Sequence, residues 1–70
     1  MRKINLVMTH DPQADACYIY LYKNKGDVAK AVTLKLTTKA VTDTINLDFT
    51  QEGKLVGIEI LNAETQLDVL

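Results

Sequence analysis

With 70 residues and a net charge of -1, the chain is long enough for one small domain, which buries only about 60% of its unfolded surface. This slightly negative net charge argues against sequence-independent binding to nucleic acid, because such binding needs a basic surface that displaces counterions. Cys17 is the only cysteine, so an internal disulfide is excluded, and no apolar run reaches the roughly 18 residues of a membrane span. No secretory leader is visible, and we expect a reduced, cytoplasmic protein without cofactors that gains stability by association.

The charges are unevenly distributed along the chain. Residues 23–39 carry five lysines and one aspartate, whereas residues 43–70 carry six acidic residues and one lysine. Such a dipolar chain can orient a partner or a second copy of itself, but solvated strand faces and edges produce the same pattern.

The first half of the chain predicts two strands joined by a tight turn. Residues 4–9 alternate apolar and polar side chains except at Val7, which indicates a first strand. Asp11 and Pro12 end it, since proline lacks a backbone donor and the carboxylates of Asp11 and Asp15 can accept local backbone bonds, so residues 10–15 form a turn. Residues 16–22 alternate apolar side chains with three tyrosines and predict an interior strand.

A third strand follows a loop at residues 23–27. Val32, Leu34 and Leu36 share one phase, which is typical of an amphipathic strand. If the chain turns back near Ala40-Val41, the apolar residues of this strand pair with those of the next one. The expected pairs are Leu36 with Ile45, Leu34 with Leu47, Val32 with Phe49, and Lys35 with Asn46.

The strongest pattern in the chain is a hairpin that turns at Glu52-Gly53. Apolar residues keep the same phase before and after this turn. The expected pairs are Phe49 with Val56, Leu47 with Ile58, and Ile45 with Ile60, with Asn46, Asp48, Gly57 and Glu59 on the opposite face.

Residues 62–70 predict a helix of two turns at most, which is too short to cover the apolar face of five strands. We therefore expect a single mainly β domain over residues 1–70: a five-stranded antiparallel meander sheet with a short C-terminal helical turn. It self-associates through its apolar face, with a dimer favoured, or curls into a small closed β-barrel. The side chains that need cover are Ile19, Leu34, Leu36, Ile45, Leu47, Phe49, Val56, Ile58 and Ile60.

Three segments form a recognisable pattern: Asp11-Pro12-Gln13-Ala14-Asp15-Ala16-Cys17-Tyr18-Ile19, Ile45-Asn46-Leu47-Asp48-Phe49, and Gly53-Lys54-Leu55-Val56-Gly57-Ile58-Glu59-Ile60-Leu61. Over about residues 10–63 the chain resembles domain-of-unknown-function family 2283, a family of small prokaryotic proteins. It departs from the family pattern at His10, Cys17 and Asn62. The resemblance implies a compact β-rich domain and supplies no activity. It also implies a binding or antitoxin-like role, because members often look like one half of a two-gene arrangement.

Tyr18, Tyr20 and Tyr22 project from one side of one strand, and with Lys35 they form the candidate partner-contact surface. Tyrosine suits a half-exposed strand face without any partner, but a stripe of three can also anchor a protein or stack single-stranded bases.

Asp11 and Asp15 are the weaker candidates for metal binding or acid-base chemistry, with Asp48 and Glu59 from other strands. A calcium loop needs more ligands and a glycine at the bend, so the turn interpretation of Asp11, Pro12 and Asp15 is preferred. Cys17 shares the apolar phase and is expected to be a buried, inert thiol rather than a nucleophile paired with His10.

Two glycines are candidate structural positions. Gly53 is required by the turn, and Gly57 lies inside a strand, where it either marks a local twist opposite Asp48 or leaves room for a crossing tyrosine from the second strand. Taken together, the sequence predicts a non-catalytic, homo-oligomeric protein-binding module. Single-stranded nucleic-acid binding through the tyrosine face is the alternative, and a small enzyme using Asp11 and Asp15 is the weaker one.

Overall fold

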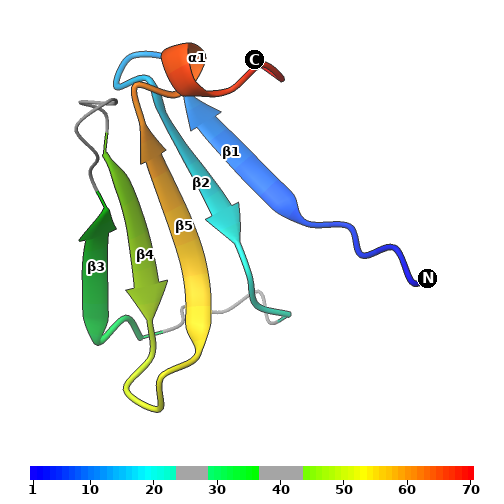
Figure 1. The fold of residues 1–70 in the computed structure, drawn as a ribbon, viewed down its shortest axis with the longest axis vertical. Helices are drawn as coiled ribbons and strands as arrows, with labels where there is room; N and C mark the ends of the chain where they lie inside the picture. The colour runs from blue at the N-terminus through cyan, green and yellow to red at the C-terminus, as the bar shows by residue number, and fades with distance from the viewer. Residues whose placement is uncertain (24–28, 37–43) are drawn as a thin grey trace.

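Five antiparallel strands form one open sheet, followed by a single helical turn (Figure 1). The computed structural model describes residues 1–23, 29–36 and 44–70. The elements are β1 (Val7–Asp11), β2 (Ala16–Tyr20), β3 (Val32–Leu36), β4 (Ile45–Phe49), β5 (Leu55–Leu61) and α1 (Ala63–Gln66). The predicted mainly β fold is confirmed, and because β1 and β3 are edges of an open sheet, the closed barrel is not formed.

The strand order is β1-β2-β5-β4-β3, so the sheet is not a continuous meander. β3, β4 and β5 lie side by side as predicted. The second neighbour of β2 is β5, however, whereas in a meander it would be β3. Alternation of apolar residues specifies which face a side chain takes, and it does not specify which strand is the neighbour. The apolar residues of β2 and β5 match in phase as well as those of any other two strands. Ile19 lies opposite Ile58, and Cys17 lies opposite Ile60.

The predicted register of the last three strands is confirmed except at one pair. All the expected partners of β3 and β4 are found, and Ile45 and Leu47 lie opposite Ile60 and Ile58. Phe49, however, lies opposite Leu55 and not Val56. The turn explains the shift, because Thr50 and Lys54 are joined by a 2.8 Å backbone hydrogen bond that makes Phe49 and Leu55 the next pair. Val56 becomes the extra residue of a bulge and turns inward.

Several predicted boundaries shift by a few residues. The first strand begins at Val7 rather than at residue 4 and continues through Asp11, because the five residues of β2 pair with residues 7–11. The turn is correspondingly shorter, and the C-terminal helix has one turn of four residues. The predicted loop at residues 24–27 and the turn near Ala40-Val41 lie outside the described residues. In the described part of the chain, no helix has the length and apolar character needed to span a membrane.

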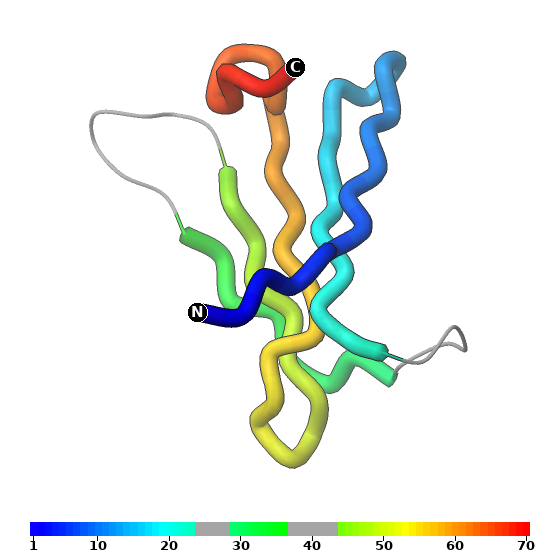
Figure 2. Tube along the Cα trace, turned by 90° about the vertical axis from the view of Figure 1, so that its right-hand side faces the viewer, coloured from blue at the N-terminus to red at the C-terminus, as the bar shows by residue number. Residues whose placement is uncertain are grey.

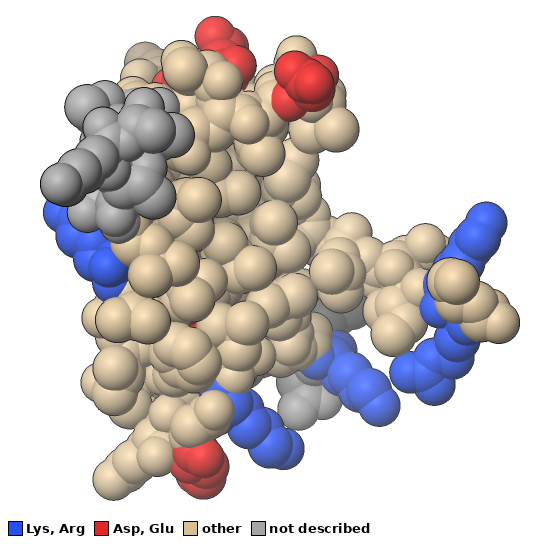
Figure 3. All heavy atoms as spheres, viewed as in Figure 1, with Lys and Arg blue, Asp and Glu red and all other residues tan. Residues whose placement is uncertain are grey.

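The core lies at one end of the apolar face, where α1 rests on the sheet (Figure 2). It consists of buried Cys17, Ile60 and Ala63 with half-buried Ile19, Ile58 and Leu67 packed against them. Beyond α1 the face is open: Val32, Leu34 and Leu36 of β3 are 57%, 50% and 42% exposed. Figure 3 shows this side of the sheet, with a broad surface free of charged side chains and the charges placed around its margin.

Candidate functional site

A buried carboxylate organises the opposite, polar face of the sheet. Asp48 of β4 is only 6% exposed, although the alternation placed it on the face away from the apolar side chains. Its Oδ2 accepts a hydrogen bond from the Tyr18 hydroxyl at 2.6 Å, and its Oδ1 accepts one from the Thr33 hydroxyl at 2.7 Å. The ammonium group of Lys30 lies 3.5 Å from Oδ2. The four side chains form the Asp48 cluster.

Gly57 makes this cluster possible. Tyr18 is on β2 and Asp48 is on β4, so the tyrosine must cross β5, and it does so where Gly57 lies opposite Asp48. A Cβ atom on Gly57 would overlap the hydroxyl and ring of Tyr18. Of the two interpretations that the sequence left open for Gly57, the contact with Tyr18 supports the one in which the glycine leaves room for a tyrosine from the second strand.

The charges of the cluster reinforce one another. Burial alone would raise the pKa of Asp48, but hydrogen bonds from Tyr18 and Thr33 and the charge of Lys30 outweigh it and lower this pKa. The pKa of Tyr18 is raised, first by burial and then by its bond to Asp48. The pKa of Lys30 is raised, chiefly by its contact with Tyr18. At neutral pH the cluster thus holds a carboxylate, a neutral phenol and an ammonium ion.

The three tyrosines pack against each other along the polar face. The ring centroids of Tyr18 and Tyr20 are 4.8 Å apart, and those of Tyr20 and Tyr22 are 5.9 Å apart. The lysine beside them is Lys30, whose Nζ lies 4.4 Å from the centroid of the Tyr18 ring, close enough for a cation–π interaction. Lys35 is exposed on β3, with β4 and β5 between it and Tyr18, so it does not join the stripe.

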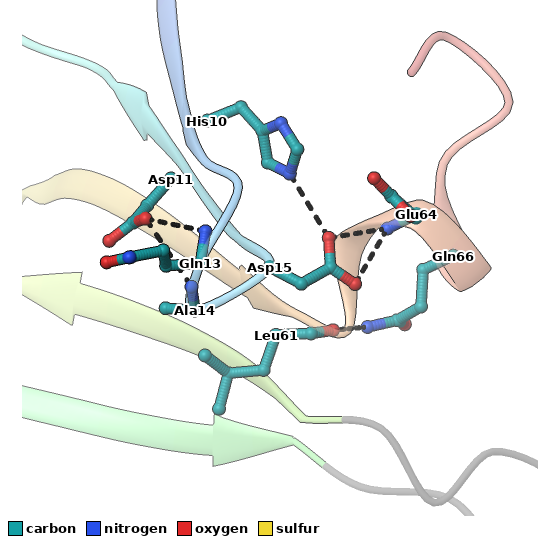
Figure 4. A network of polar contacts seen from close by, with 8 residues as sticks. All are labelled: His10, Asp11, Gln13, Ala14, Asp15, Leu61, Glu64 and Gln66. Atoms are coloured by element: carbon teal, nitrogen blue, oxygen red, sulfur yellow. Dashed lines mark hydrogen bonds and ion pairs between the residues drawn. The ribbon is translucent and has the colours of Figure 1, made fainter.

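The first turn uses its two carboxylates on separate backbone groups (Figure 4). Asp11, next to Pro12, accepts the N–H groups of Gln13 at 3.0 Å and Ala14 at 3.4 Å. Asp15 adopts a left-handed conformation with φ of 49°, and its carboxylate accepts the N–H of Glu64 at the start of α1 at 3.1 and 3.3 Å. The contacts of Asp11 confirm the turn chemistry predicted for it. The prediction that Asp15 accepts local backbone bonds is wrong, because its carboxylate bonds to His10 and to the distant backbone of α1. α1 begins at Ala63, and the carboxylate that accepts the N–H of Glu64 in its first turn is that of Asp15.

His10, Asp15 and Glu64 place three metal-compatible donor atoms within 4.8 Å of one another. His10 Nε2 lies 3.1 Å from Asp15 Oδ1, and Figure 4 shows both groups beside the Glu64 carboxylate. One imidazole and two carboxylates suit a divalent transition metal. The carboxylate of Asp15 already bonds to the His10 imidazole and to the backbone N–H of Glu64, so structural bonds explain why His10 and Asp15 lie together.

Cys17 is buried with 1% exposure, as predicted, and its thiol is free. The register places His10 of β1 directly opposite it. The imidazole nevertheless bonds to Asp15, so the histidine is engaged away from the thiol. Gly53 has φ of +87°, which confirms that the β4–β5 turn requires a glycine there.

A family model described as a protein of unknown function, DUF2283, matches residues 8–64. The chain belongs to the DUF2283 family. Neither a curated protein nor a solved structure matches it. The family segments now have structural meaning: the Asp-Pro turn bonds to α1, and the Val-Gly-Ile segment is the bulged central strand that Tyr18 crosses.

Sequence reasoning missed Lys30, Thr33 and the burial of Asp48. Lys30 precedes β3, so no strand pattern assigned it to a face. A signal for Asp48 was present, because a glycine inside a strand, directly opposite an aspartate, indicates that another side chain covers both positions.

Proposed function

We propose that this DUF2283 chain is a non-catalytic, homo-oligomeric protein-binding module whose apolar sheet face binds a second copy of itself. The observation that carries the proposal is the open part of that face. Leu34 and its neighbours on β3 are about half exposed, and the four-residue α1 is the only helix over the described residues. Large apolar patches on small soluble domains mark interaction surfaces.

The sheet face is of the size that a small interface needs. Five strands of five to seven residues, spaced about 4.8 Å apart, cover roughly 400 Å² in projection, and a standard interface buries about 800 Å² of accessible surface from each partner. Two sheets stacked through such faces would form the sandwich core that a single 70-residue layer lacks.

The test is a pair of charge variants on adjacent residues of β3. Leu34→Glu places a carboxylate on the apolar face, and Lys35→Glu places one on the opposite face of the same strand. Both positions are exposed in the single chain, so neither change disturbs its own core. We expect wild type and Lys35→Glu to sediment as dimers at micromolar concentration in analytical ultracentrifugation, and Leu34→Glu to dissociate at least tenfold more readily. A wild-type protein that stays monomeric at high micromolar concentration would end the proposal.

Single-stranded nucleic-acid binding is less well supported by the tyrosine stripe. The Tyr18 hydroxyl is committed to Asp48, the ring of Tyr18 is covered by Lys30, and the expected Lys35 lies on another strand. Asp11 and Asp15 are weak candidates for an active site because both carboxylates bond to backbone N–H groups.

The antitoxin-like pairing that the family resemblance suggests forms a second part of the proposal. Tyr20 and Tyr22 are half exposed, lie on the face opposite the apolar one, and border a hollow of about 480 Å³ beside residues 4–7. We expect a cytoplasmic partner protein, encoded by the adjacent gene, to bind there. Copurification of that protein with the tagged chain should be lost in Tyr22→Ser and retained in Lys35→Glu, and equal retention in both would remove this surface.

A further inference from the structure

Among the residues that the structure describes, α1 is the helix that covers the apolar face, and it lies at one end of that face. α1 sits on the face above Cys17 and Ile60, and Leu67 beyond it packs against the same cluster. At the other end of the strands lies the β4–β5 turn, Thr50–Lys54, which is a tight hydrogen-bonded loop (Figures 1 and 2). A second copy must accommodate this asymmetry.

The thickness of a helix decides between the two ways of stacking. A helix with its side chains is about 10–12 Å across, and packed sheets lie about 10 Å apart. If both copies carried α1 at the same end, two helices would meet and hold the sheets about twice as far apart as packed sheets lie. If the copies point in opposite directions, each α1 occupies the layer at the partner's unobstructed end.

The charges of the two ends are also complementary. Among the described residues, four acidic side chains lie at the α1 end, and the opposite end carries lysines together with two carboxylates, Glu52 and Asp48, of which Asp48 is paired with Lys30 on the polar face. Figure 3 shows acidic side chains at the α1 end and basic ones toward the other end and the N-terminal segment. The acidic residues at the α1 end are Asp11, Asp15, Glu64 and Asp68, and the lysines at the other end that lie outside the Asp48 cluster are Lys23 and Lys54.

From the helix position and the charges together, we infer that two copies stack face to face in opposite strand directions, about a two-fold axis perpendicular to the strands. The occupant of the apolar face is a second copy of this chain, and α1 of each copy lies beside the partner's Thr50–Lys54 turn. The inference rests on the proposed homo-oligomeric function and adds the orientation of the partner. Charge complementarity and close packing of the sheets both favour this orientation.

Spin labels measure the orientation directly. Lys54→Cys and Asp68→Cys place single labels at exposed sites near opposite ends, and wild-type protein, whose Cys17 is buried, controls for labelling elsewhere. If wild type takes up label, both variants are made in a Cys17→Ala background. Pulsed electron resonance then gives the distance between labels on the two copies.

We expect about 30 Å or more between labels at position 54 on both copies, and the same for position 68. A mixture of the two variants should add a distance under about 20 Å, because sheets lie about 10 Å apart and the labelled sites then face each other. A short distance between two position-54 labels would overturn the orientation and leave the dimer intact. Absence of any intermolecular distance, with monomers in ultracentrifugation, would overturn the inference and the proposed function together.

Discussion

Replacing Asp48 with alanine will lower the free energy of unfolding by about 3 kcal/mol, because it removes the shared acceptor of a buried hydrogen-bond cluster. The hydroxyls of Tyr18 and Thr33 lose their partner, and Lys30 loses its counter-ion. Urea denaturation at one fixed protein concentration measures the change, since association adds to apparent stability. Asn46→Ala is the matched control, because Asn46 lies on the same strand and the same face as Asp48. This change removes only a bond to Glu59 and should lower the free energy of unfolding by about 1 kcal/mol.

Asp48 also predicts that the free energy of unfolding falls at acidic pH, which we call the acid limb. The folded-state pKa of Asp48 lies below its ordinary value, so the unfolded chain takes up the proton first. The contribution is therefore complete above about pH 5 and is lost as the pH falls below about 4. For Tyr18 and Lys30 the pKa values are raised, so their contributions persist to about pH 9 and decline above about pH 10. Asp48→Asn should flatten the acid limb, and an unchanged limb would mean that other carboxylates cause it.

Gly57→Ala will destabilise the fold by about 2–4 kcal/mol, although it adds only one methyl group. The new Cβ occupies the space of the Tyr18 hydroxyl, so the ring must swing away from Asp48 and the cluster opens. Alanine is otherwise better than glycine inside a strand, by roughly 0.5–1 kcal/mol. The expected loss therefore comes entirely from the tyrosine that crosses β5.

A double-mutant cycle separates this cause from any general effect on β5. In a Tyr18→Ala background, Gly57→Ala should be neutral or slightly stabilising, because nothing remains for the Cβ to displace. Tyr18→Phe, which keeps the ring and loses only the hydroxyl, should give an intermediate result. If Gly57→Ala costs the same with and without Tyr18, then the glycine serves the bulge at Val56 and not the tyrosine.

Apolar alternation was sufficient to predict the strands, their faces and most of their pairing. β3 and β4 were placed in register because Leu34 and Leu47 must share a face, and a slip of one residue would have put them on opposite faces. Apolar alternation did not predict that β2 pairs with β5. Any two strands whose apolar residues match in phase could be neighbours, because their apolar side chains would then share one face. The shift at Phe49 depends on the hydrogen bonds of one turn, which alternation does not record.

The polar cluster was harder to predict than the core. Asp48 alternates like a solvated residue, and its burial follows from two other segments of the chain, one supplying Tyr18 of β2 and the other Lys30 and Thr33. Only Gly57 gave a local sign of it. The type of an apolar side chain already predicts that it is buried. A carboxylate is predicted to be buried only when the donors that bond to it are known from the structure.

The middle position of β5 has a consequence for how the molecule matures on the ribosome. The β1–β2 and β3–β4 hairpins are translated before β5, and in the finished sheet the backbone ladders of the two hairpins are joined through β5, which the Tyr18–Asp48 bond crosses. Two-stranded hairpins are marginally stable alone in water. The nascent polypeptide must therefore wait, with both hairpins unjoined, until β5 arrives and closes the sheet in one late, cooperative event.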